Sequence, residues 1–340
     1  MRKAFTILGS IFGVIVLVVV LCGVALWAVR RHNADKYTIM STSAPLKDKS
    51  TYQTNDHVVP IEGEYLNGFH FIPERRQHPG TLVVFGGSEG SPNYEQAKAL
   101  SEQGYEVLSL FFFGQPNQVP TLARVPLDQF DEISEFIHAN IERPTPITLI
   151  GSSKGAEFTA ELAAHGYAFD NLVNYAPADH TYAGLDFSSR DEKPSFAYRG
   201  EDVPFASFRT VDGATSRAMI WDLMIGRPPR YRETYVQAAE RADASTRIDL
   251  RNFKGNGLLF AGAEDAMWQS ELAATGLSGS APNLEAMVYP GAGHLFSEDI
   301  ASFGTGWEIM FGGTAAGAAT AYRESQAVLL DRLNRWHGSL

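Results

Sequence analysis

The alternation of apolar and polar stretches along the 340-residue chain predicts buried strands separated by amphipathic helices. Short apolar runs bounded by turn residues indicate strands covered on both faces, and apolar residues three or four positions apart indicate helices. The predicted strands are residues 81–85, 106–112, 147–150, 171–175, 257–260 and 284–289. The predicted helices are residues 93–103, 127–140, 154–164 and 315–336. This order predicts βαβ units, and therefore an α/β fold with a mostly parallel sheet and helices on both faces.

Two stretches depart from this alternation of strands and helices. Residues 58–71 read as two short strands around Glu62-Gly63-Glu64, which predicts a hairpin. Residues 178–254 form a long, aromatic-rich connection, and connections of that length are usually lids or binding insertions. A helical decoration that only packs on the sheet is the alternative. Because the last two strands must rejoin the sheet, we expect residues 57–340 to form a single domain.

The N-terminal segment predicts a membrane anchor. Residues 4–29 contain no charged residue, and a bilayer needs only about 20 apolar residues to be spanned. The apolar part of a cleaved signal peptide is shorter, roughly 7–15 residues. We therefore expect residues 1–32 to form one uncleaved transmembrane helix with Trp27 near its boundary, followed by a polar tether over residues 33–56. A cleaved signal peptide is the alternative.

The charges around this helix leave its orientation open. Arg2 and Lys3 precede the apolar run, whereas Arg30, Arg31 and several lysines follow it. The excess of positive charge after the helix favours a cytoplasmic domain. A short basic N-terminus before a long apolar run more often stays inside, which would export the domain. The predicted location is a single-pass membrane protein whose soluble side is unresolved.

Composition excludes several classes of function. The net charge of −11 argues against nucleic-acid binding, which needs a basic face. The single cysteine, Cys22, lies in the apolar segment, so the soluble part has no disulfide and no thiolate metal site. The glycine-rich loop at residues 86–91 lacks the lysine and the spacing of phosphate-binding motifs. No metal-ligand spacing is present either, and we predict neither a cofactor nor a metal.

The stretch from Ile147 to Glu157 carries the candidate chemistry. An apolar strand ends in Gly151-Ser152-Ser153-Lys154-Gly155 and passes directly into a helix. A strand, a sharp Gly-x-Ser-x-Gly turn and a helix form a nucleophile elbow. The register of the motif selects Ser153 as the nucleophile.

Two later loops supply a candidate acid and base. In α/β-hydrolases the nucleophile is followed along the chain by Asp or Glu and then by His, each after a strand. Asp265 follows the strand at 257–260, and we prefer it to Glu264 because a shorter side chain suits a buried orienting role. His294 follows the strand at 284–289. His337 is the only other histidine after Asp265, and we expect it on the surface beside the C-terminus.

Backbone amides are the expected oxyanion donors. In this arrangement one donor follows the nucleophile and the other lies in the loop after an earlier strand. These rules select the N–H groups of Lys154 and Gly87.

Several motifs, spread in order from about residue 80 to 336, carry a resemblance to a known family. They are Phe85-Gly-Gly-Ser-Glu-Gly90, Leu108-Ser-Leu-Phe-Phe-Phe-Gly114, Val125-Pro-Leu-Asp-Gln-Phe130, Gly151-Ser-Ser-Lys-Gly-Ala-Glu157, Ser195-Phe-Ala-Tyr-Arg-Gly200, Gly262-Ala-Glu-Asp-Ala-Met-Trp268, Pro290-Gly-Ala-Gly-His294 and Gly312-Gly-Thr314. They resemble the C-terminal catalytic domain shared by acyl-CoA thioesterases and bile-acid-CoA:amino-acid N-acyltransferases, which is related to dienelactone hydrolases. The family's nucleophile, acid and base correspond to Ser153, Asp265 and His294.

The departures from this family refine the expected function. Animal members carry an extra N-terminal β-sandwich, for which residues 33–75 are too few, and they lack a membrane anchor. The acyltransferases use Cys where this chain has Ser153, and a serine acyl-enzyme favours hydrolysis over amide formation. We therefore expect a membrane-anchored serine hydrolase that cleaves an ester or thioester. Arg227, Arg230 and Arg232 are candidate contacts for a CoA phosphate.

Two further readings stay open at this point. One is an acyltransferase of the same family, and the other is a non-catalytic, hydrolase-like binding protein. The expected partners are a small acyl ester or thioester and the lipid bilayer.

Overall fold

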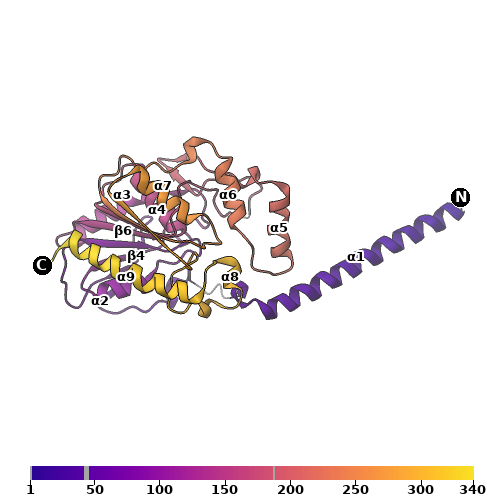
Figure 1. Cartoon of the computed structure of the whole chain (residues 1–340), viewed down its shortest axis with the longest axis horizontal. Helices are drawn as coiled ribbons and strands as arrows, with labels where there is room; N and C mark the ends of the chain where they lie inside the picture. Colours follow the sequence, from indigo (N-terminus) through magenta and orange to yellow (C-terminus); the bar gives the residue numbers. More distant parts are fainter. Residues whose placement is uncertain (1, 42–45, 187) are drawn as a thin grey trace.

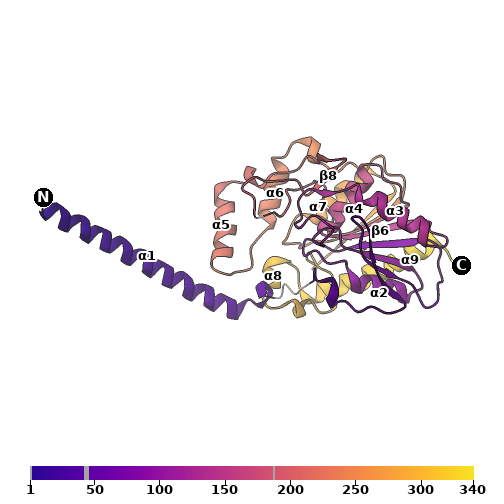
Figure 2. The ribbon, with the colours of Figure 1, turned by 180° about the vertical axis from the view of Figure 1, so that it is seen from behind.

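The computed structural model describes residues 2–41, 46–186 and 188–340 of the chain. A single long helix, α1 (Arg2–Lys36), projects away from a domain that contains all the strands (Figures 1 and 2). This helix contains the predicted apolar run and continues past residue 32, where the predicted anchor ends.

The domain is built around one eight-stranded sheet. In spatial order its strands are β1 (Val58–Glu62), β2 (Asn67–Phe71), β4 (Glu106–Leu110), β3 (Thr81–Phe85), β6 (Ile147–Ser152), β7 (Asn171–Tyr175), β10 (Asn256–Gly262) and β11 (Leu284–Tyr289). The β1–β2 and β2–β4 pairs are antiparallel, and all other neighbours are parallel. The predicted hairpin, the mostly parallel sheet and the return of the last two strands to it are confirmed.

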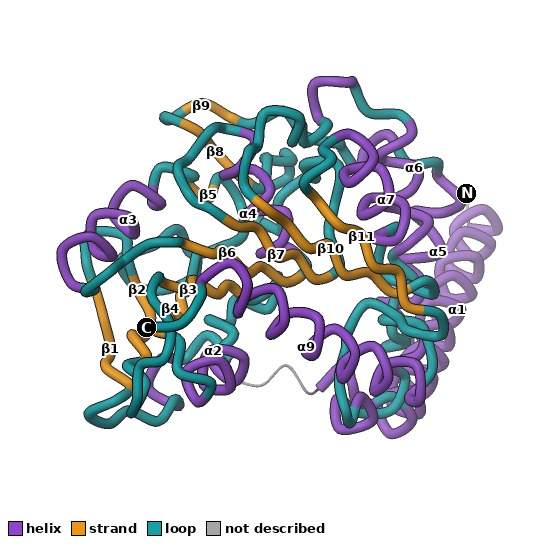
Figure 3. Tube along the Cα trace, turned by 60° about the vertical axis from the view of Figure 1, so that its left-hand side comes forward, coloured by secondary structure: helices purple, strands orange, loops and turns teal. Residues whose placement is uncertain are grey.

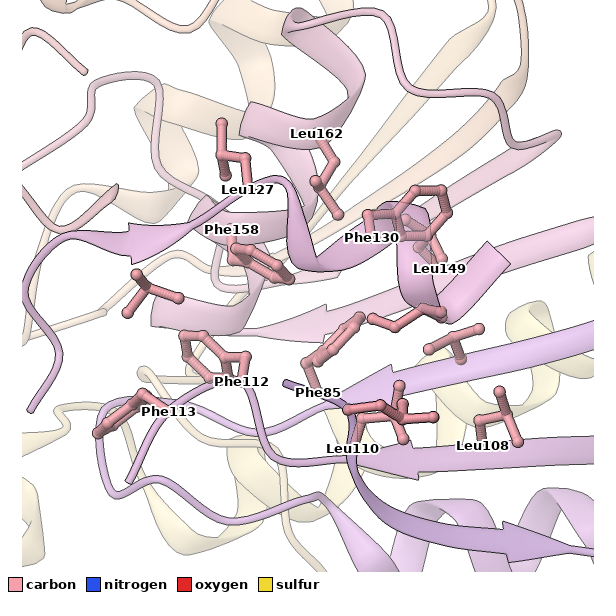
Figure 4. Close-up of a cluster of buried hydrophobic side chains, with 14 of the residues drawn as sticks. Phe85, Leu108, Leu110, Phe112, Phe113, Leu127, Phe130, Leu149, Phe158 and Leu162 are labelled. Carbon is pink, nitrogen blue, oxygen red and sulfur yellow. The ribbon is translucent and has the colours of Figure 1, made fainter. Parts of the chain in front are cut away.

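Helices cover both faces of the sheet (Figure 3). Helices α3 (Gln129–Asn140), α4 (Lys154–Ala164) and α7 (Ser270–Ser280) pack on one face, and α2 (Tyr94–Glu102) and α9 (Ala315–His337) pack on the other. Successive side chains of a strand point to opposite faces. Val83 and Phe85 accordingly join the cluster under α3 and α4, where Phe85 meets Phe158 (Figure 4), while Leu82 and Val84 join the cluster under α2 and α9.

The insertion at residues 178–254 forms a layer above the carboxyl ends of the strands. It contains α5 (Gly213–Met224), α6 (Arg232–Glu240), β8 (Phe196–Tyr198) and β9 (Glu201–Asp202). The last two strands join β5 (Val125–Pro126) in a small three-stranded sheet. The sequence did not predict this sheet, because strands of two or three residues leave no periodic signal. Helix α7 was also missed, since Gly276 and Gly279 weaken its helical pattern.

Short helices complete the chain. They are α8 (Trp307–Met310), η1 (Thr38–Ser41), η2 (Lys49–Thr51), η3 (Phe208–Thr210), η4 (Ala244–Thr246) and η5 (Ile300–Phe303). The parts of the predicted tether that the structure describes contact the domain. Thr38 N–H donates to the Thr305 hydroxyl at 3.1 Å, and the Gln115 amide donates to the Lys47 carbonyl at 2.8 Å. Residues 42–45 of the predicted tether lie outside the described residues.

His337 was expected on the surface, and the structure corrects this. It is buried in the last turn of α9, where its Nδ1 lies 2.8 Å from the Pro79 carbonyl and its Nε2 lies 2.8 Å from the Thr148 hydroxyl. A carbonyl only accepts, so Nδ1 carries the proton and the Thr148 hydroxyl donates to Nε2. The tertiary structure buries His337, because the C-terminal end of α9 packs against the amino ends of β3 and β6.

This burial predicts a pH-dependent stability. Burial lowers the pKa of His337 from 6.5 to about 4, so between these values the unfolded chain binds more protons than the folded one. The stabilisation is complete above pH 6.5 and is lost as the pH falls towards 4, by roughly 3 kcal/mol in all. Urea unfolding in detergent at pH 7 and pH 4.5 should show a smaller loss of stability for His337→Gln than for the wild type. Equal losses in the two proteins would contradict this assignment.

Candidate active site

Ser153 occupies the sharp turn between β6 and α4. Its backbone has φ 55° and ψ −118°, and a non-glycine residue with positive φ is strained unless its surroundings hold it there. The Ser153 N–H donates to the Tyr175 carbonyl on the neighbouring strand β7 at 2.9 Å. The residue is only partly buried. The turn therefore presents the Ser153 hydroxyl at the carboxyl edge of the sheet, where a substrate can reach it.

The two glycines of the motif are required by close backbone contacts. A Cβ atom on Gly155 would lie 2.1 Å from the Gly86 carbonyl oxygen, and one on Gly151 would lie 2.2 Å from the Gly155 carbonyl oxygen. Real Cβ atoms do not approach other atoms this closely. Glycine at both positions lets α4 start against β6 and against the loop that follows β3.

The structure brings Ser153, Asp265 and His294 together. The Ser153 Oγ lies 2.9 Å from His294 Nε2, and the Asp265 Oδ2 lies 2.9 Å from His294 Nδ1. Because an ionised carboxylate only accepts, Nδ1 carries the proton, and Nε2 is left to accept from the serine hydroxyl. This is the relation of nucleophile, base and orienting acid that acyl transfer by a serine needs. Glu264, the alternative acid, is exposed.

Asp265 is held in a dense set of donors. Its Oδ1 accepts from the N–H groups of Met267 and Trp268 at 2.8 and 3.2 Å, and its Oδ2 accepts from the Ser270 hydroxyl at 2.6 Å. The side chain is 1% exposed. These bonds fix the carboxylate in the orientation that places His294.

The two loops that carry Asp265 and His294 lie directly against each other. A Cβ atom on Gly262 would lie 2.1 Å from the Gly293 carbonyl oxygen, and one on Gly293 would lie 2.2 Å from the Gly312 carbonyl oxygen. Arg232, from the insertion, donates to the backbone carbonyls of Asp265 and Trp268 at 2.6 and 3.0 Å. The insertion therefore helps to position the acid loop, a contact that the sequence did not reveal.

The backbone N–H groups of the two expected oxyanion donors have different surroundings in the structure. Lys154 is the first residue of α4, so its backbone N–H has no partner within the helix. Gly87 packs directly on Ser153, but its N–H donates to the carboxylate of Glu89 at 2.9 Å. The same carboxylate oxygen accepts from the Ser91 hydroxyl at 2.6 Å. An oxyanion bound to the Gly87 N–H would have to replace Glu89, which lies only two residues away along the chain.

The Lys154 side chain points away from the reacting groups. Its Nζ is 2.7 Å from the Glu157 carboxylate and 3.0 Å from the Ser195 hydroxyl of the insertion, and both charged side chains are fully buried. Burial lowers the pKa of the Lys154 amine, and the Glu157 charge opposes this shift. Burial also raises the pKa of Glu157. The pair ties the elbow helix to the insertion, and its three-residue spacing was visible in the sequence.

The arginines considered for a CoA phosphate are paired within the protein. Arg227 and Arg230 contact the buried Asp222, at 3.7 and 2.7 Å, and Arg232 pairs with Glu271. The sequence could not show these pairs, because they join residues that meet only after the insertion has folded.

Several aromatic residues of the insertion belong to one packed cluster. Tyr182 and Tyr235 pack with Trp268, whose ring centroid is 5.4 Å from that of His294. A hollow of about 420 Å³ lies at the amino ends of the strands, beside Pro146 and Asn256, and is therefore far from Ser153. These aromatic residues of the predicted lid or binding insertion therefore stabilise the insertion itself.

Comparison with known proteins addresses the fold. No protein-family model matches the chain, and no curated protein matches it in sequence. An esterase from Pyrococcus furiosus superimposes with a TM-score of 0.50 at 15% identity, over 86% of this chain and 94% of the esterase. A soluble variant of the monoglyceride lipase from Saccharomyces cerevisiae superimposes with a TM-score of 0.50 at 13% identity, over 84% and 98%. The chain has the α/β-hydrolase fold.

A third structure superimposes less well. A dienelactone hydrolase-like phosphotriesterase from metagenomic libraries matches at 14% identity with a TM-score of 0.46, over 83% of this chain and 98% of the other. The narrower likeness to acyl-CoA thioesterases rests on the sequence motifs alone. In an α/β-hydrolase the site lies at the carboxyl ends of the strands, which is where the loops after β6, β10 and β11 meet here.

The buried ion pair beside the elbow predicts a large stability effect. Glu157→Gln leaves the Lys154 ammonium without its counter-charge, and breaking a buried pair in this way costs about 3–5 kcal/mol of unfolding free energy. The double variant Lys154→Met with Glu157→Leu should be less destabilised than Glu157→Gln, since it buries no unpaired charge. Urea unfolding in detergent measures both.

The exposed pair Lys98–Glu102 provides the matched control. Glu102→Gln should leave the urea midpoint almost unchanged, because exposed ion pairs contribute little. A Glu157→Gln protein as stable as Glu102→Gln would show that the buried pair does not hold the insertion.

Proposed function

We propose that this protein is a serine hydrolase that cleaves a carboxylic ester or thioester through an acyl-enzyme. The observation that carries the proposal is the chain of two 2.9 Å contacts from the Ser153 hydroxyl through His294 to Asp265. An accessible serine at a strained turn, a base within hydrogen-bond reach and a buried orienting carboxylate are the parts that this chemistry requires. The fold, shared with an esterase and a lipase at low identity, is compatible with this activity.

The proposed reaction begins when the Ser153 Oγ attacks the carbonyl carbon of the substrate. The proton passes to His294 Nε2, and Asp265 stabilises the resulting imidazolium through Nδ1–H. Backbone N–H groups of Lys154 and Gly87 bind the oxyanion of the tetrahedral intermediate. The intermediate collapses to a Ser153 ester, and His294 gives its proton to the leaving group. A water molecule, deprotonated by His294, then hydrolyses the acyl-enzyme and regenerates the serine.

The paired arginines favour an ester over a CoA thioester. A CoA phosphate would have to compete with Asp222 and Glu271 for Arg227, Arg230 and Arg232. Ser153 in place of Cys favours water over an amine as the acyl acceptor. The acyltransferase reading therefore ranks behind hydrolysis, and amide product formed on addition of an amine acceptor would restore it.

We also propose that α1 is a retained membrane anchor. The segment Phe12–Lys36 has a mean hydropathy of 2.9 over its most apolar window, and none of that window is buried against the domain. A cleaved signal peptide would share these properties. The Asn33 side chain, however, donates to the Ile225 carbonyl at 2.8 Å, and the Thr305 hydroxyl donates to the Lys36 carbonyl at 2.7 Å. These contacts support retention, because the end of the helix is part of the folded domain.

Removal of the nucleophile should abolish turnover. Ser153→Ala is expected to reduce hydrolysis of p-nitrophenyl butyrate by roughly 10⁶-fold, because no other group can form the acyl-enzyme. Ser152→Ala is the matched control, since it removes the same hydroxyl one residue earlier and should retain activity. A fluorophosphonate probe should label the wild type and Ser152→Ala but not Ser153→Ala. Labelling of Ser153→Ala, or turnover by it, would refute the assignment, and absence of labelling in the wild type would favour a non-catalytic protein.

The contact between Glu89 and Gly87 predicts a variant with increased activity. The Glu89 carboxylate must leave the Gly87 N–H before the oxyanion can bind there, and hydrogen bonds to a charged group contribute about 1.5–3 kcal/mol. Glu89→Gln weakens that competition and should raise kcat/KM for p-nitrophenyl butyrate by about tenfold. Glu95→Gln, on the exposed side of α2, is the control and should not change it. A fall in kcat/KM for Glu89→Gln would mean that Glu89 orders the loop and does not compete with the oxyanion.

A further inference from the structure

Helix α5 has its polarity reversed relative to an ordinary surface helix. A surface helix normally buries an apolar stripe and exposes charged residues. The only buried residue of α5 is Asp222, which is 1% exposed and paired with Arg230. The large apolar side chains around it, Ile220, Trp221, Leu223 and Met224, are 50, 55, 42 and 44% exposed. The helix therefore turns its carboxylate inward and its apolar side chains outward.

The C-terminal end of α5 lies against the end of α1. Figures 1 and 2 show α5 on the side of the domain from which α1 projects. The carbonyl of Ile225, directly after α5, accepts from Asn33 at 2.8 Å, and Gly226 packs against Arg30. Asn33 lies four residues beyond Val29, where the uncharged run ends, which is about 6 Å along a helix. The end of α5 is therefore held within about one helical turn of the point where the apolar segment ends.

We propose that the outer face of α5 docks into the lipid bilayer beside α1, so that the site receives esters of amphiphilic lipids from the membrane. This inference rests on the proposed function and on α1 as a membrane span. An amphipathic helix in the interface buries its apolar side chains at the boundary between headgroups and acyl chains, and Trp221 is a residue type enriched there.

Both membrane-contacting elements are connected to the proposed catalytic loops. The chain from His294 continues to Thr305, whose backbone N–H and side chain bond to Thr38 and to the Lys36 carbonyl at the end of α1. The insertion that contains α5 reaches the acid loop through Arg232. Docking of α5 would therefore direct the carboxyl edge of the sheet, and Ser153 with it, towards the bilayer. A long-chain ester could then reach Ser153 without leaving the membrane for water.

A depth measurement on the full chain tests the docking without using enzyme activity. Cys22→Ser removes the only cysteine, and Leu223→Cys then carries an environment-sensitive NBD fluorophore in phosphatidylcholine vesicles that contain doxyl-labelled lipid. The control is Leu272→Cys on α7, which is also exposed, at 61%. Doxyl lipid should quench the probe at 223 and leave the probe at 272 unquenched. Equal quenching at both positions would overturn the proposal. A blue-shifted but unquenched probe at 223 would also overturn it, because it would indicate that a second copy of the chain covers α5.

An activity comparison tests the substrate class. The variant Trp221→Ser with Leu223→Ser should lose about tenfold in the rate on a long-chain p-nitrophenyl ester embedded in vesicles, equivalent to about 1.4 kcal/mol of lost apolar burial. Its rate on soluble p-nitrophenyl butyrate should be unchanged, which also shows that it folds. Leu272→Ser should match the wild type on both substrates.

The outcomes separate the two proposals. Equal rates of the variant and the wild type on the vesicle-embedded ester would reject lipid esters delivered from the bilayer. A wild type that hydrolyses neither ester would reject the proposed function, and the fluorophore measurement would still decide whether α5 docks.

Discussion

The site depends on how closely two backbones approach each other at the start of α4. Only glycine at positions 151 and 155 lets the helix lie against β6 and against the carbonyl of Gly86. That contact holds Ser153 at positive φ, and it also brings Gly87 against the serine. The proposed nucleophile and both expected oxyanion donors are therefore positioned by one steric constraint. A single methyl group at either glycine would separate the elements that the proposed chemistry requires to be in contact.

Close backbone contacts also position Asp265 and His294. Gly262 and Gly293 allow the two loops to stack, so that Asp265 and His294 meet although 29 positions separate them along the chain. Hydrogen bonds then fix the orientation of the Asp265 carboxylate, because it accepts from three donors besides the imidazole. The insertion adds a further support through Arg232. The Asp265 and His294 side chains are therefore preorganised, since neither can move without losing several contacts at once.

The insertion combines a buried carboxylate, Asp222, with an outer helix face that is apolar. The Lys154–Glu157 pair of α4 contacts the insertion through the Ser195 hydroxyl and the Tyr182 N–H. Within the insertion, the buried Asp222 pairs with the half-exposed Arg230. A buried charge is costly to leave unpaired, and the pair with Arg230 allows Asp222 to lie inward while α5 carries apolar side chains on its outer face. This arrangement suits a domain fixed beside the proposed membrane anchor α1, because water is then not the only solvent that its surface meets. The inward Asp222 carboxylate and the outward apolar side chains of α5 both fit the proposed position of the insertion at the bilayer.

The sequence by itself determined the strands of the main sheet, the helices α1, α2, α3, α4 and α9, and the identity of Ser153, Asp265 and His294 as candidates, because each of these depends on local pattern. Apolar periodicity reports burial over a few residues, the elbow is a five-residue motif, and the acid and base follow from the order of loops after strands. The tertiary structure decided the contacts between distant residues. Glu89 on the Gly87 amide, the burial of His337 and the pairing of Arg230 with Asp222 all depend on which side chains meet once the layers have packed. A periodic pattern states that a residue is buried or exposed, but it does not name the partner that satisfies its charge or its hydrogen bonds.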